Sequence, residues 1–425
     1  MRGVSLWRAV LGVGKKTVVE RVVEDGAAGV IVVHVRPVKS ERGRCGICRC
    51  RCPGYDGGSG RRRWRGLDAG AVRVFCEAEA PRVRCAEHGV VVAAVPWARH
   101  GAGHTRGFDD QVAWLAVVCS KTAVTRLMRI AWRTVGAIVE RVCAETDARV
   151  DRFAGLRRIG IDEISYRRGY RYLTVVVDHD TGLLVWAADG HNERTLLAFF
   201  EVLGAERCQK ITHVSADGAG YIAKAVAACC PRAVRCIDPF HVISWATDAL
   251  DEVRRQAWRQ ASRELGRRRN GAIRLPRGHS DAHRRIKRSR WALWKNPENL
   301  TEPQADKLAW IAKTHPRLHR AYLLKEGLRH VFKTAADPAQ ALDCWLAWAQ
   351  RCRIEVFIEL GRKIKRHRSE IEATVTHRLS NALVESVNTK IRLITRMAFG
   401  FHSPDALIAM AMLALGGYRP TLPGR

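Results

Sequence analysis

The sequence predicts a multidomain α/β protein organised around a mixed β-sheet. With 425 residues, the chain is too long for one ordinary hydrophobic core, and roughly two to four domains are expected. Between residues 158 and 238, three apolar runs are followed by alternating helical and strand patterns, in the order βββαβαβ. Such alternation requires a mixed sheet with helices on its faces, and ligands of such sheets bind beyond the strand ends.

The apolar runs and their periodicity define the elements of this stretch. Strands are predicted over residues 158–164, 172–178, 183–188, 211–216 and 233–237. Helices are predicted over residues 193–203 and 221–229. The sequence His-Asp-Thr-Gly at residues 179–182 is a turn signal between the second and third strands, so the first three strands are expected to form a hairpin meander.

Two of the predicted strands lead to a carboxylate. Asp162 lies where the first strand leaves the core, and Asp217 follows the fourth strand. This topology can place the two strand ends side by side. Because Mg²⁺ prefers a few carboxylate oxygens and keeps several waters, the pair is the beginning of a divalent-metal site.

A third acid lies far downstream, in a helical pattern over residues 378–392. Apolar residues recur there at helical spacing. By the three-and-four rule, one stripe of the helix contains Asn381, Glu385, Asn388 and Arg392. Glu385 is at the centre of that stripe, and with Asp162 and Asp217 it forms a coherent triad of acids.

Four motifs can be compared with a known family. They are Ile-Gly-Ile-Asp-Glu at residues 159–163, Val-Ser-Ala-Asp-Gly at 214–218, Asp-Pro-Phe-His-Val at 238–242 and Asn-Ala-Leu-Val-Glu-Ser-Val-Asn at 381–388. Together they resemble the motifs of ISL-three-type insertion-sequence transposases, and the resemblance covers nearly the whole chain. It implies a ribonuclease-H-like catalytic domain with a DDE triad, and by motif position it assigns the acids to Asp162, Asp217 and Glu385.

Such a triad has a known chemistry. Two Mg²⁺ or Mn²⁺ ions, roughly 3.5 to 4 Å apart, can activate a water or a 3′-hydroxyl and stabilise the leaving oxygen in an in-line attack on phosphorus. We expect Asp162 to touch both ions, and Asp217 and Glu385 each to favour one. Rival carboxylates are Glu163, Asp178, Asp180 and Asp238.

Asp238 is the most serious rival, because it too ends a strand. With His241 it belongs to the third motif, and Asp217 already matches the position of the family's second acid. We therefore expect Asp238 and His241 to support the metal ligands, together with Asn381 and Asn388 on the Glu385 helix.

The charge balance indicates a polyanionic partner. The chain has 73 Lys and Arg against 42 Asp and Glu, a formal net charge of +31, and a pI near 10.4. DNA or RNA is the most plausible partner, because phosphate neutralisation releases counterions. No apolar run approaches the roughly 20 residues of a membrane-spanning helix. Basic residues interrupt any signal-peptide-like stretch at the amino terminus, so a cytoplasmic, nucleoid-associated protein is expected.

The fourteen cysteines are interpreted as metal ligands and buried thiols of a reducing compartment. Two short-spaced pairs, Cys45 with Cys48 and Cys85 with His88, can each supply one edge of a tetrahedral Zn²⁺ site. The resemblance supports this interpretation, because the family has a zinc-binding module at this place. The second pair is less typical than a second CxxC, and the competing ligands are Cys50, Cys52 and Cys76.

Residues 101–150 follow a helical pattern with a tight middle turn. Three short helices of this kind fit a helix-turn-helix, whose last helix can enter a major groove of DNA. The pattern alone also fits any small helical bundle, and the family position favours the helix-turn-helix. Arg133 and Arg141 are then the predicted DNA-contacting charges, with Thr134 as a further contact.

Well over a hundred residues separate the last strand from the Glu385 helix, far more than a loop contains, so a helical insertion is expected. The predicted division is an N-terminal β-hairpin region (1–40), a zinc-ribbon module (41–100), a helix-turn-helix domain (101–150), the first part of the catalytic core (151–250), a basic helical insertion (251–370) and the second part of the core (371–416). The basic residues expected to contact DNA, beyond those of the helix-turn-helix, are Arg61, Arg62, Arg63, Arg267, Arg268, Arg269, Arg284, Arg285, Lys287 and Arg288.

Together these features predict a transposase that binds the terminal inverted repeats of its element and cuts and joins DNA. Double-stranded DNA, both element ends and target, is the expected partner. A homo-oligomer is expected because two ends must be brought together. Two alternatives remain: a catalytically inactive DNA-binding regulator, and a structure-selective nuclease that cuts without joining.

Overall fold

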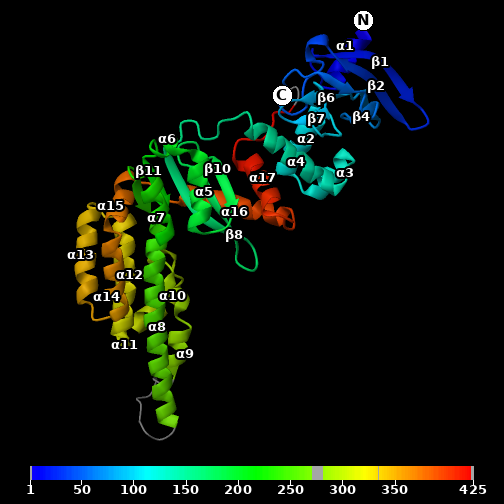
Figure 1. Ribbon diagram of the computed structural model, residues 1–425. Coiled ribbons are helices and arrows are strands. Elements are labelled where there is room, and N and C mark those ends of the chain that lie inside the picture. Colours follow the sequence, from blue (N-terminus) through cyan, green and yellow to red (C-terminus); the bar gives the residue numbers. More distant parts are fainter. Residues whose placement is uncertain (1, 270–280, 334, 423–425) are drawn as a thin grey trace.

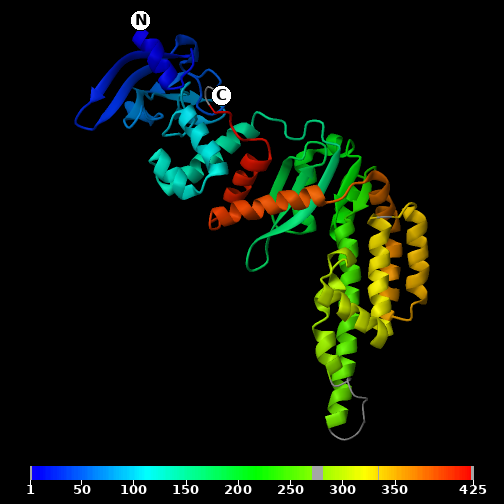
Figure 2. The same cartoon turned by 180° about the vertical axis from the view of Figure 1, so that it is seen from behind.

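The computed structural model describes residues 2–269, 281–333 and 335–422, without the side chains of residues 2–5 and 266–269. The molecule is elongated (Figure 1). A β-rich region containing the N-terminus lies at one end, a mixed sheet lies in the middle, and a long helical body lies at the other end. The view from behind shows the same order and places the C-terminus next to the N-terminal region (Figure 2).

The N-terminal region contains two small sheets. The four-stranded sheet has the order β1-β2-β5-β4, with β1 Thr17–Asp25, β2 Val30–Pro37, β4 Arg61–Arg65 and β5 Arg73–Glu79. The three-stranded sheet consists of β3 Gly54–Asp56, β6 Arg82–Cys85 and β7 Gly89–Val92. The predicted hairpin is present as β1 and β2, preceded by a helix that was not predicted, α1 Arg2–Val10.

This hairpin is not a separate unit. β2 pairs in parallel with β5, and both strands bury side chains in one core around Trp64 and Trp97. A division at residue 40 therefore separates strands of a single sheet.

Three helices follow, as the sequence predicts: α2 Arg106–Val118, α3 Lys121–Met128 and α4 Trp132–Asp147. The α2 helix begins where the Thr105 hydroxyl accepts a hydrogen bond from the amide of Phe108. The Ser120 hydroxyl caps α3 in the same way, by accepting a hydrogen bond from the amide of Ala123. Arg129, in the left-handed conformation, ends α3 and turns the chain into α4.

The central sheet has five strands in the order β10-β9-β8-β11-β12. They are β8 Arg158–Arg167, β9 Arg171–Asp178, β10 Leu184–Asp189, β11 His213–Ala216 and β12 Val234–Ile237. The first three strands pair antiparallel, whereas β8, β11 and β12 pair in parallel. All five predicted strands are confirmed, and β8 extends three residues further than predicted.

Helices cover both faces of this sheet. One face packs against α5 Glu193–Leu203 and α7 Gly220–Cys229, with α6 Ala205–Cys208 between them. The other face packs against α16 Ala382–Met397 and α17 Pro404–Leu415, and the same core continues into α2, α3 and α4. The helices α2, α3 and α4 are thus attached to the central sheet through α17. In both views α17 lies between these three helices and the sheet (Figures 1 and 2).

The stretch between β12 and α16 is helical, as expected. Its helices are α8 Pro239–Arg269, α9 Ala282–Lys287, α10 Arg290–Trp294, α11 Glu302–Thr314, α12 Pro316–Lys333, α13 Pro338–Arg351, α14 Glu355–Arg366 and α15 Arg368–His377. They share a core of their own, to which Leu250, Leu328 and Phe357 contribute. Among the described residues, the search for a helix long and apolar enough to span a membrane finds none.

Candidate catalytic carboxylates and zinc cluster

Three acids end up level with one another at one edge of the central sheet. Ser215 of β11 pairs with Gly160 of β8, so Asp217 lies level with Asp162 when this register continues by two residues. Ala216 of β11 pairs with Ile237 of β12, which places Asp238 beside Asp217. Neighbouring strands are about 4.8 Å apart, so the three carboxylates share the edge at which the parallel strands end.

Glu385 approaches this edge from α16. A side chain at Gly160 would place its Cβ 2.4 Å from Cγ2 of Val384, so only glycine lets α16 lie this close to β8. Asn381 Nδ2 donates to the carbonyl of Ile161 at 3.1 Å, which fixes the start of the helix against the strand. The close approach explains how a glycine two residues before Asp162 helps to bring Glu385 towards the acids.

Asn388, one turn further along α16, contacts the central acid directly. Its Nδ2 donates to Oδ2 of Asp162 at 2.8 Å, and Oδ1 of Asp162 accepts from the amide of Glu163. Both oxygens of Asp162 therefore have a fixed orientation. The predicted polar stripe of the helix does face the strand, with Asn381 and Asn388 buried and Glu385 exposed.

The acids are crowded enough to resist ionisation. Burial, with smaller contributions from the nearby Asp217 and Asp238, raises the pKa of Asp162 to about 6, although the Glu163 amide and His241 act to lower it. Burial, Asp217 and Asp162 raise the pKa of Glu163 to about 7. A cation would relieve this repulsion, because it favours the charged form of every neighbouring carboxylate.

Glu385 belongs to the same electrostatic neighbourhood. Burial and the charge of Asp238 raise its pKa, whereas His241 and Arg392 lower it. Asp238 thus interacts electrostatically with both Asp162 and Glu385. Among the residues that the structure describes, however, these carboxylates do not form a closed metal-binding group; the zinc cluster below is the group that does.

Asp238 itself is 3% exposed and only partly paired. Its Oδ1 accepts from the amide of Asn381 at 3.4 Å. Its Oδ2 has no hydrogen-bond partner among the described residues, and Nε2 of His241 lies 4.0 Å away. A buried carboxylate oxygen without a partner is costly, so this atom is open to a cation or a water.

The rival acids Asp178 and Asp180 lie elsewhere. Asp178 pairs with Ile159, at the opposite end of β8 from the tip of the strand, and accepts a hydrogen bond from the Thr181 hydroxyl. Asp180 forms an ion pair with Arg158. Both acids stabilise the turn between β9 and β10.

Two supporting residues were missed by sequence reasoning. The Ser215 hydroxyl donates to Oδ1 of Asn381, and Nε2 of His179 lies 2.7 Å from the same hydroxyl. This chain of contacts fixes the Asn381 amide and hence the start of α16. The signal in the sequence was a serine between the apolar residues Val214 and Ala216 at the end of a predicted strand, and the structure shows that Ser215 is fully buried.

The four predicted zinc ligands come together. The ligand atoms of Cys45, Cys48, Cys85 and His88 all lie within 4.8 Å of one another. The Cys48 and Cys85 sulfurs are 3.7 Å apart, and Nδ1 of His88 lies 3.6 Å from the Cys85 sulfur. A tetrahedral ion with Zn–S bonds of about 2.3 Å needs sulfurs about 3.8 Å apart, so the spacing fits zinc.

One thiol of the cluster is already prepared for metal binding. Backbone amides, that of His88 foremost, lower the pKa of Cys85 to about 6, and the thiolate is the form that binds zinc. Of the competing cysteines, Cys76 is buried in the core of β5, and burial raises its pKa to about 12. Cys52 lies beside Cys85, as their electrostatic interaction shows, and remains a neighbour of the cluster.

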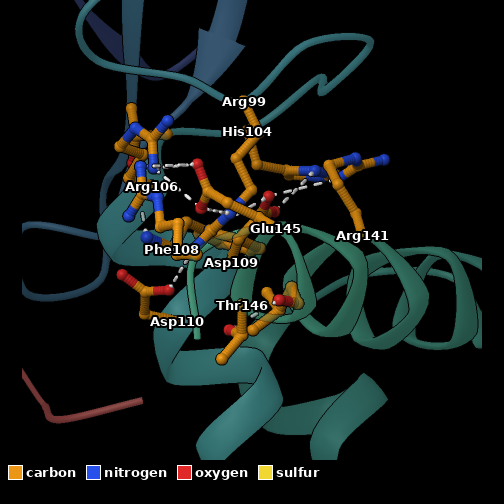
Figure 3. A network of polar contacts seen from close by, with 12 residues as sticks. Arg99, His104, Arg106, Phe108, Asp109, Asp110, Arg141, Glu145 and Thr146 are labelled. Carbon is orange, nitrogen blue, oxygen red and sulfur yellow. Dashed lines mark hydrogen bonds and ion pairs between the residues drawn. The ribbon is translucent and has the colours of Figure 1, made fainter. Parts of the chain in front are cut away.

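A network of ion pairs joins Arg99, which follows the zinc-containing strands, to the helices α2 and α4 (Figure 3). Arg99, before α2, donates to Asp110 at 2.6 Å and to Glu145 of α4 at 2.7 Å. Arg141 donates to Asp109 at 3.1 Å, and Asp109 is fully buried. The charge of Arg141 is thus compensated within the protein, although the residue was expected to contact DNA.

The remaining residues predicted to contact DNA differ in whether another group of the protein already binds their side chains. Arg61 and Arg63 both donate to Glu77 at 2.8 Å, and Arg62 donates to the carbonyl of Ala102 at the same distance. Arg133, at the start of α4, is exposed and forms no ion pair among the described residues. Thr134 beside it is half-buried.

The basic residues of the insertion form a second exposed group. The side chains of α9 and the residue after it point to solvent, namely those of Arg284, Arg285, Lys287 and Arg288. The Arg285 guanidinium also lies 4.3 Å from the ring centre of Trp310. The side chains of Arg267, Arg268 and Arg269 lie outside the described residues.

Comparisons with known proteins agree with this arrangement. Residues 159–411 match a family described as "Transposase", of the ISL3 DDE type. Residues 93–143 match the "Helix-turn-helix domain of transposase family ISL3", and residues 41–88 match the "zinc-finger of transposase IS204/IS1001/IS1096/IS1165". These three matches follow one another along the chain in the order that the motifs predict.

Two relatives extend the likeness to whole chains. The transposase for insertion sequence element IS1557 of Mycobacterium tuberculosis is 61% identical over 436 aligned positions, which cover 100% of this chain and 98% of the relative. The transposase for insertion sequence element IS1001 of Bordetella parapertussis is 26% identical over 313 positions, 71% of this chain and 73% of the relative.

Proposed function

The chain belongs to the ISL3 family of insertion-sequence transposases, and from that premise we propose that Asp162, Asp217 and Glu385 are its catalytic acids. The protein is a DNA transposase of the DDE type and therefore an enzyme. The observation that carries the assignment is the register of the central sheet, which sets Asp162 level with Asp217 while α16 brings Glu385 towards the same edge.

The catalytic domain has a ribonuclease-H-like fold in this proposal. Its support is the order β10-β9-β8-β11-β12, with three antiparallel strands followed by two parallel ones and helices on both faces. The helical insertion enters after β12, and the chain returns to the sheet at α16. The insertion therefore starts and ends beside the carboxylate edge.

The residues at this edge fit hard divalent cations such as Mg²⁺ or Mn²⁺, because carboxylate oxygens gather there and the buried Oδ2 of Asp238 has no hydrogen-bond partner among the described residues. When bound, such ions supply Lewis acidity to a water or a 3′-hydroxyl and to the leaving oxygen. Asp162 lies between Asp217 and α16 and so is the acid that can serve both ions.

The neighbouring polar residues orient the acids. Asn388 holds Oδ2 of Asp162 in place, and Asn381 links α16 to both Ile161 and Asp238. His241 lies beside Asp238 and lowers the pKa values of Asp162 and Glu385. Asp238 and His241 thus adjust the charge of the acids and support the ligands, and Asp217 remains the second catalytic acid.

Recognition of DNA belongs to the modules outside this edge. The zinc ribbon and α4, with the exposed Arg133, bind the terminal inverted repeats of the element, whereas the basic residues of α9 contact flanking DNA. Two ends must meet before strand transfer, so the active form is a homo-oligomer on DNA. We infer that the enzyme works in the cytoplasm, at the nucleoid, because its proposed substrate is chromosomal DNA and thiolate zinc ligands suit a reducing compartment.

The test is strand cleavage and joining on a duplex that carries the element's own terminal repeat, with Mg²⁺. Wild type is compared with Asp162→Asn, Asp217→Asn and Glu385→Gln at equal end binding. We expect each substitution to abolish both reactions, a loss of at least about 10³-fold. Asp238→Asn is the matched control, and it should retain measurable cleavage.

Other outcomes identify the alternatives. A wild type that binds ends and never cuts is a DNA-binding regulator, and one that cuts without joining is a nuclease. If Asp217→Asn stays active while Asp238→Asn does not, the catalytic acid is Asp238.

A further inference from the structure

The hairpin between β8 and β9 continues well beyond the carboxylate edge. β8 extends five residues past Asp162, from Glu163 to Arg167, before the chain turns back into β9 at Arg171. At about 3.3 Å per residue this is about 17 Å. Both views show the hairpin extending from the sheet on the side from which α8 also departs (Figures 1 and 2). The acids therefore lie at the base of two projecting elements.

The tip of this hairpin, residues 167–171, presents an aromatic ring to solvent. Tyr170 is 87% exposed, far more than a tyrosine in a packed surface. Its φ is 58°, and that of Gly169 before it is 89°. Non-glycine residues seldom adopt this left-handed conformation, and such outliers gather at functional sites.

The tip is also basic. Arg167, Arg168 and Arg171 are exposed, and none of them forms an ion pair with a residue in the described part of the chain. At the opposite end of the same strand, Arg158 is paired with Asp180. The strand thus has a compensated charge at one end and three uncompensated charges at the other.

The base of the hairpin packs against the rest of the sheet, whereas its tip is exposed. Ile164 and Leu173 pair across the strands and are fully buried. The Tyr166 hydroxyl donates to Asp189 of β10 at 3.1 Å, and the rings of Tyr172 and His191 are 4.4 Å apart. The ring of Tyr170 is consequently presented from an anchored scaffold.

We propose that this tip is a DNA-contacting finger, in which Tyr170 stacks on an unpaired base near the cut and the three arginines bind flanking phosphates. The inference rests on the proposed function, because it requires DNA at the carboxylate edge. An aromatic face beside guanidinium groups matches a base between phosphates. At 3.4 Å per base pair, 17 Å corresponds to about five nucleotides from the scissile phosphate.

The stacking contact is tested by photocrosslinking with the full-length protein. A precut terminal-repeat duplex carries 5-iodouracil at one position at a time, over the first eight or so nucleotides from the cut, because this base crosslinks to a stacked aromatic ring. We expect the crosslinked peptide to contain Tyr170, with the highest yield about five nucleotides from the cut. Crosslinks that map to other residues at every position overturn the proposal.

Substitutions separate stacking from folding. Tyr170→Phe keeps the ring and should retain the crosslink and cleavage. Tyr170→Asn removes the ring but suits the left-handed conformation, so thermal stability should equal or exceed that of wild type. We expect Tyr170→Asn to lower cleavage of terminal-repeat DNA by about tenfold or more. Cleavage equal to wild type overturns the stacking role.

The charges are tested by the salt dependence of end binding. Arg168→Gln is compared with Arg232→Gln, a matched control just before β12, at the opposite end of the parallel strands. Arg232 is exposed and forms no ion pair with a residue that the structure describes. A lost phosphate contact reduces the slope of log K against log salt by about 0.9. We expect this reduction for Arg168→Gln alone, and equal slopes for the two variants contradict the finger.

Two outcomes distinguish failure of the catalytic assignment from failure of the DNA-contacting finger. A wild type that does not cleave, with a crosslink at Tyr170, removes the catalytic assignment and leaves the finger. A wild type that cleaves, with an uncrosslinked Tyr170 and a fully active Tyr170→Asn, removes the finger and leaves the catalytic assignment.

Discussion

The zinc cluster and the carboxylate edge are the two proposed metal sites of the protein, and their ligand atoms are assembled to different degrees. The four zinc ligands already lie within 4.8 Å of one another, at the spacing of a tetrahedral site. The acids of the sheet are aligned by strand register and by α16, yet among the described residues they form no closed group. One site is complete within the chain, and the other is open.

The difference follows from what each metal does. A structural zinc takes all its ligands from the protein, so folding the module and assembling the site are the same event. Catalytic Mg²⁺ needs oxygens from the substrate phosphate as well as from carboxylates. In the protein alone, the acids at the carboxylate edge repel one another, and the pKa of Asp162 is raised.

The largest effect is expected at the zinc cluster. Cys85→Ser removes the thiolate with the lowered pKa, so zinc is lost and the module around residues 41–88 unfolds. Structural zinc contributes about 10 to 16 kcal/mol of apparent binding free energy, far more than a single packing contact. Zinc content and limited proteolysis measure the result.

Cys50→Ser is the control, because Cys50 is exposed and outside the cluster. It should keep its zinc. Stoichiometric zinc and protease resistance in Cys85→Ser would show that Cys52 or another ligand completes the site.

The ion-pair network predicts a pH-dependent stability. Burial raises the pKa of Asp109 from 3.8 to about 6, despite Arg141 and Arg99. Because the folded state binds this proton more tightly than the unfolded chain, ionised Asp109 lowers stability, and the penalty develops between about pH 4 and pH 6. Asp109→Asn lacks this penalty. The free energy of unfolding of the variant, relative to that of wild type, should therefore rise by up to about 3 kcal/mol between about pH 4 and pH 6.

The measurement is the difference in unfolding free energy between the two proteins, followed from pH 4 to pH 7.5. His104, whose pKa burial lowers to about 4, titrates in both proteins and largely cancels. A difference that stays constant with pH contradicts the assignment.

At the carboxylate edge, the hydrogen bond from Asn388 to Asp162 is the next test. Asn388→Ala should lower cleavage by about 10- to 100-fold and raise the Mg²⁺ concentration needed, with end binding unchanged. Val387→Ala, the neighbouring buried residue on α16, is the control for lost packing. If both variants lose activity to the same extent at all Mg²⁺ concentrations, Asn388 only stabilises the helix.

The smallest effect is expected on DNA end binding, where Arg133, exposed on α4, is compared with Arg141, which is ion-paired with Asp109. Arg133→Gln should weaken end binding a few-fold and reduce the salt slope by about 0.9. Arg141→Gln, which breaks the ion pair with Asp109, should lower stability and leave the slope unchanged. Fluorescence anisotropy at several salt concentrations measures both slopes, and a reduced slope for Arg141→Gln would return that residue to the DNA interface.

The sequence was sufficient where local periodicity decides the structure. Alternation and helical spacing predicted the five strands of the central sheet and the helices α5, α7 and α16 on its faces, whereas α17 was not predicted and β8 continues five residues past Asp162. The Cys45 and Cys48 pair was equally readable, because a CxxC turn is a local device.

What could not be predicted depends on pairing between distant segments. The parallel pairing of β2 with β5 joins the N-terminal hairpin to the zinc-containing region, and no local pattern encodes it. Arg141 lies 32 residues from Asp109, so its ion pair was invisible and the residue was assigned to DNA. The exposure of Tyr170 likewise depends on how far β8 and β9 extend beyond their neighbours.

We propose that the zinc site is complete within the chain, whereas the carboxylate site is completed by DNA. Mn²⁺ binding to the zinc-loaded protein, measured by electron paramagnetic resonance with and without a terminal-repeat duplex, tests it most directly. We expect the protein alone to bind Mn²⁺ weakly and the protein with the duplex to bind Mn²⁺ tightly. Asp162→Asn should lose the tight binding, and the zinc content should stay unchanged throughout. Equally tight Mn²⁺ binding without DNA would contradict it.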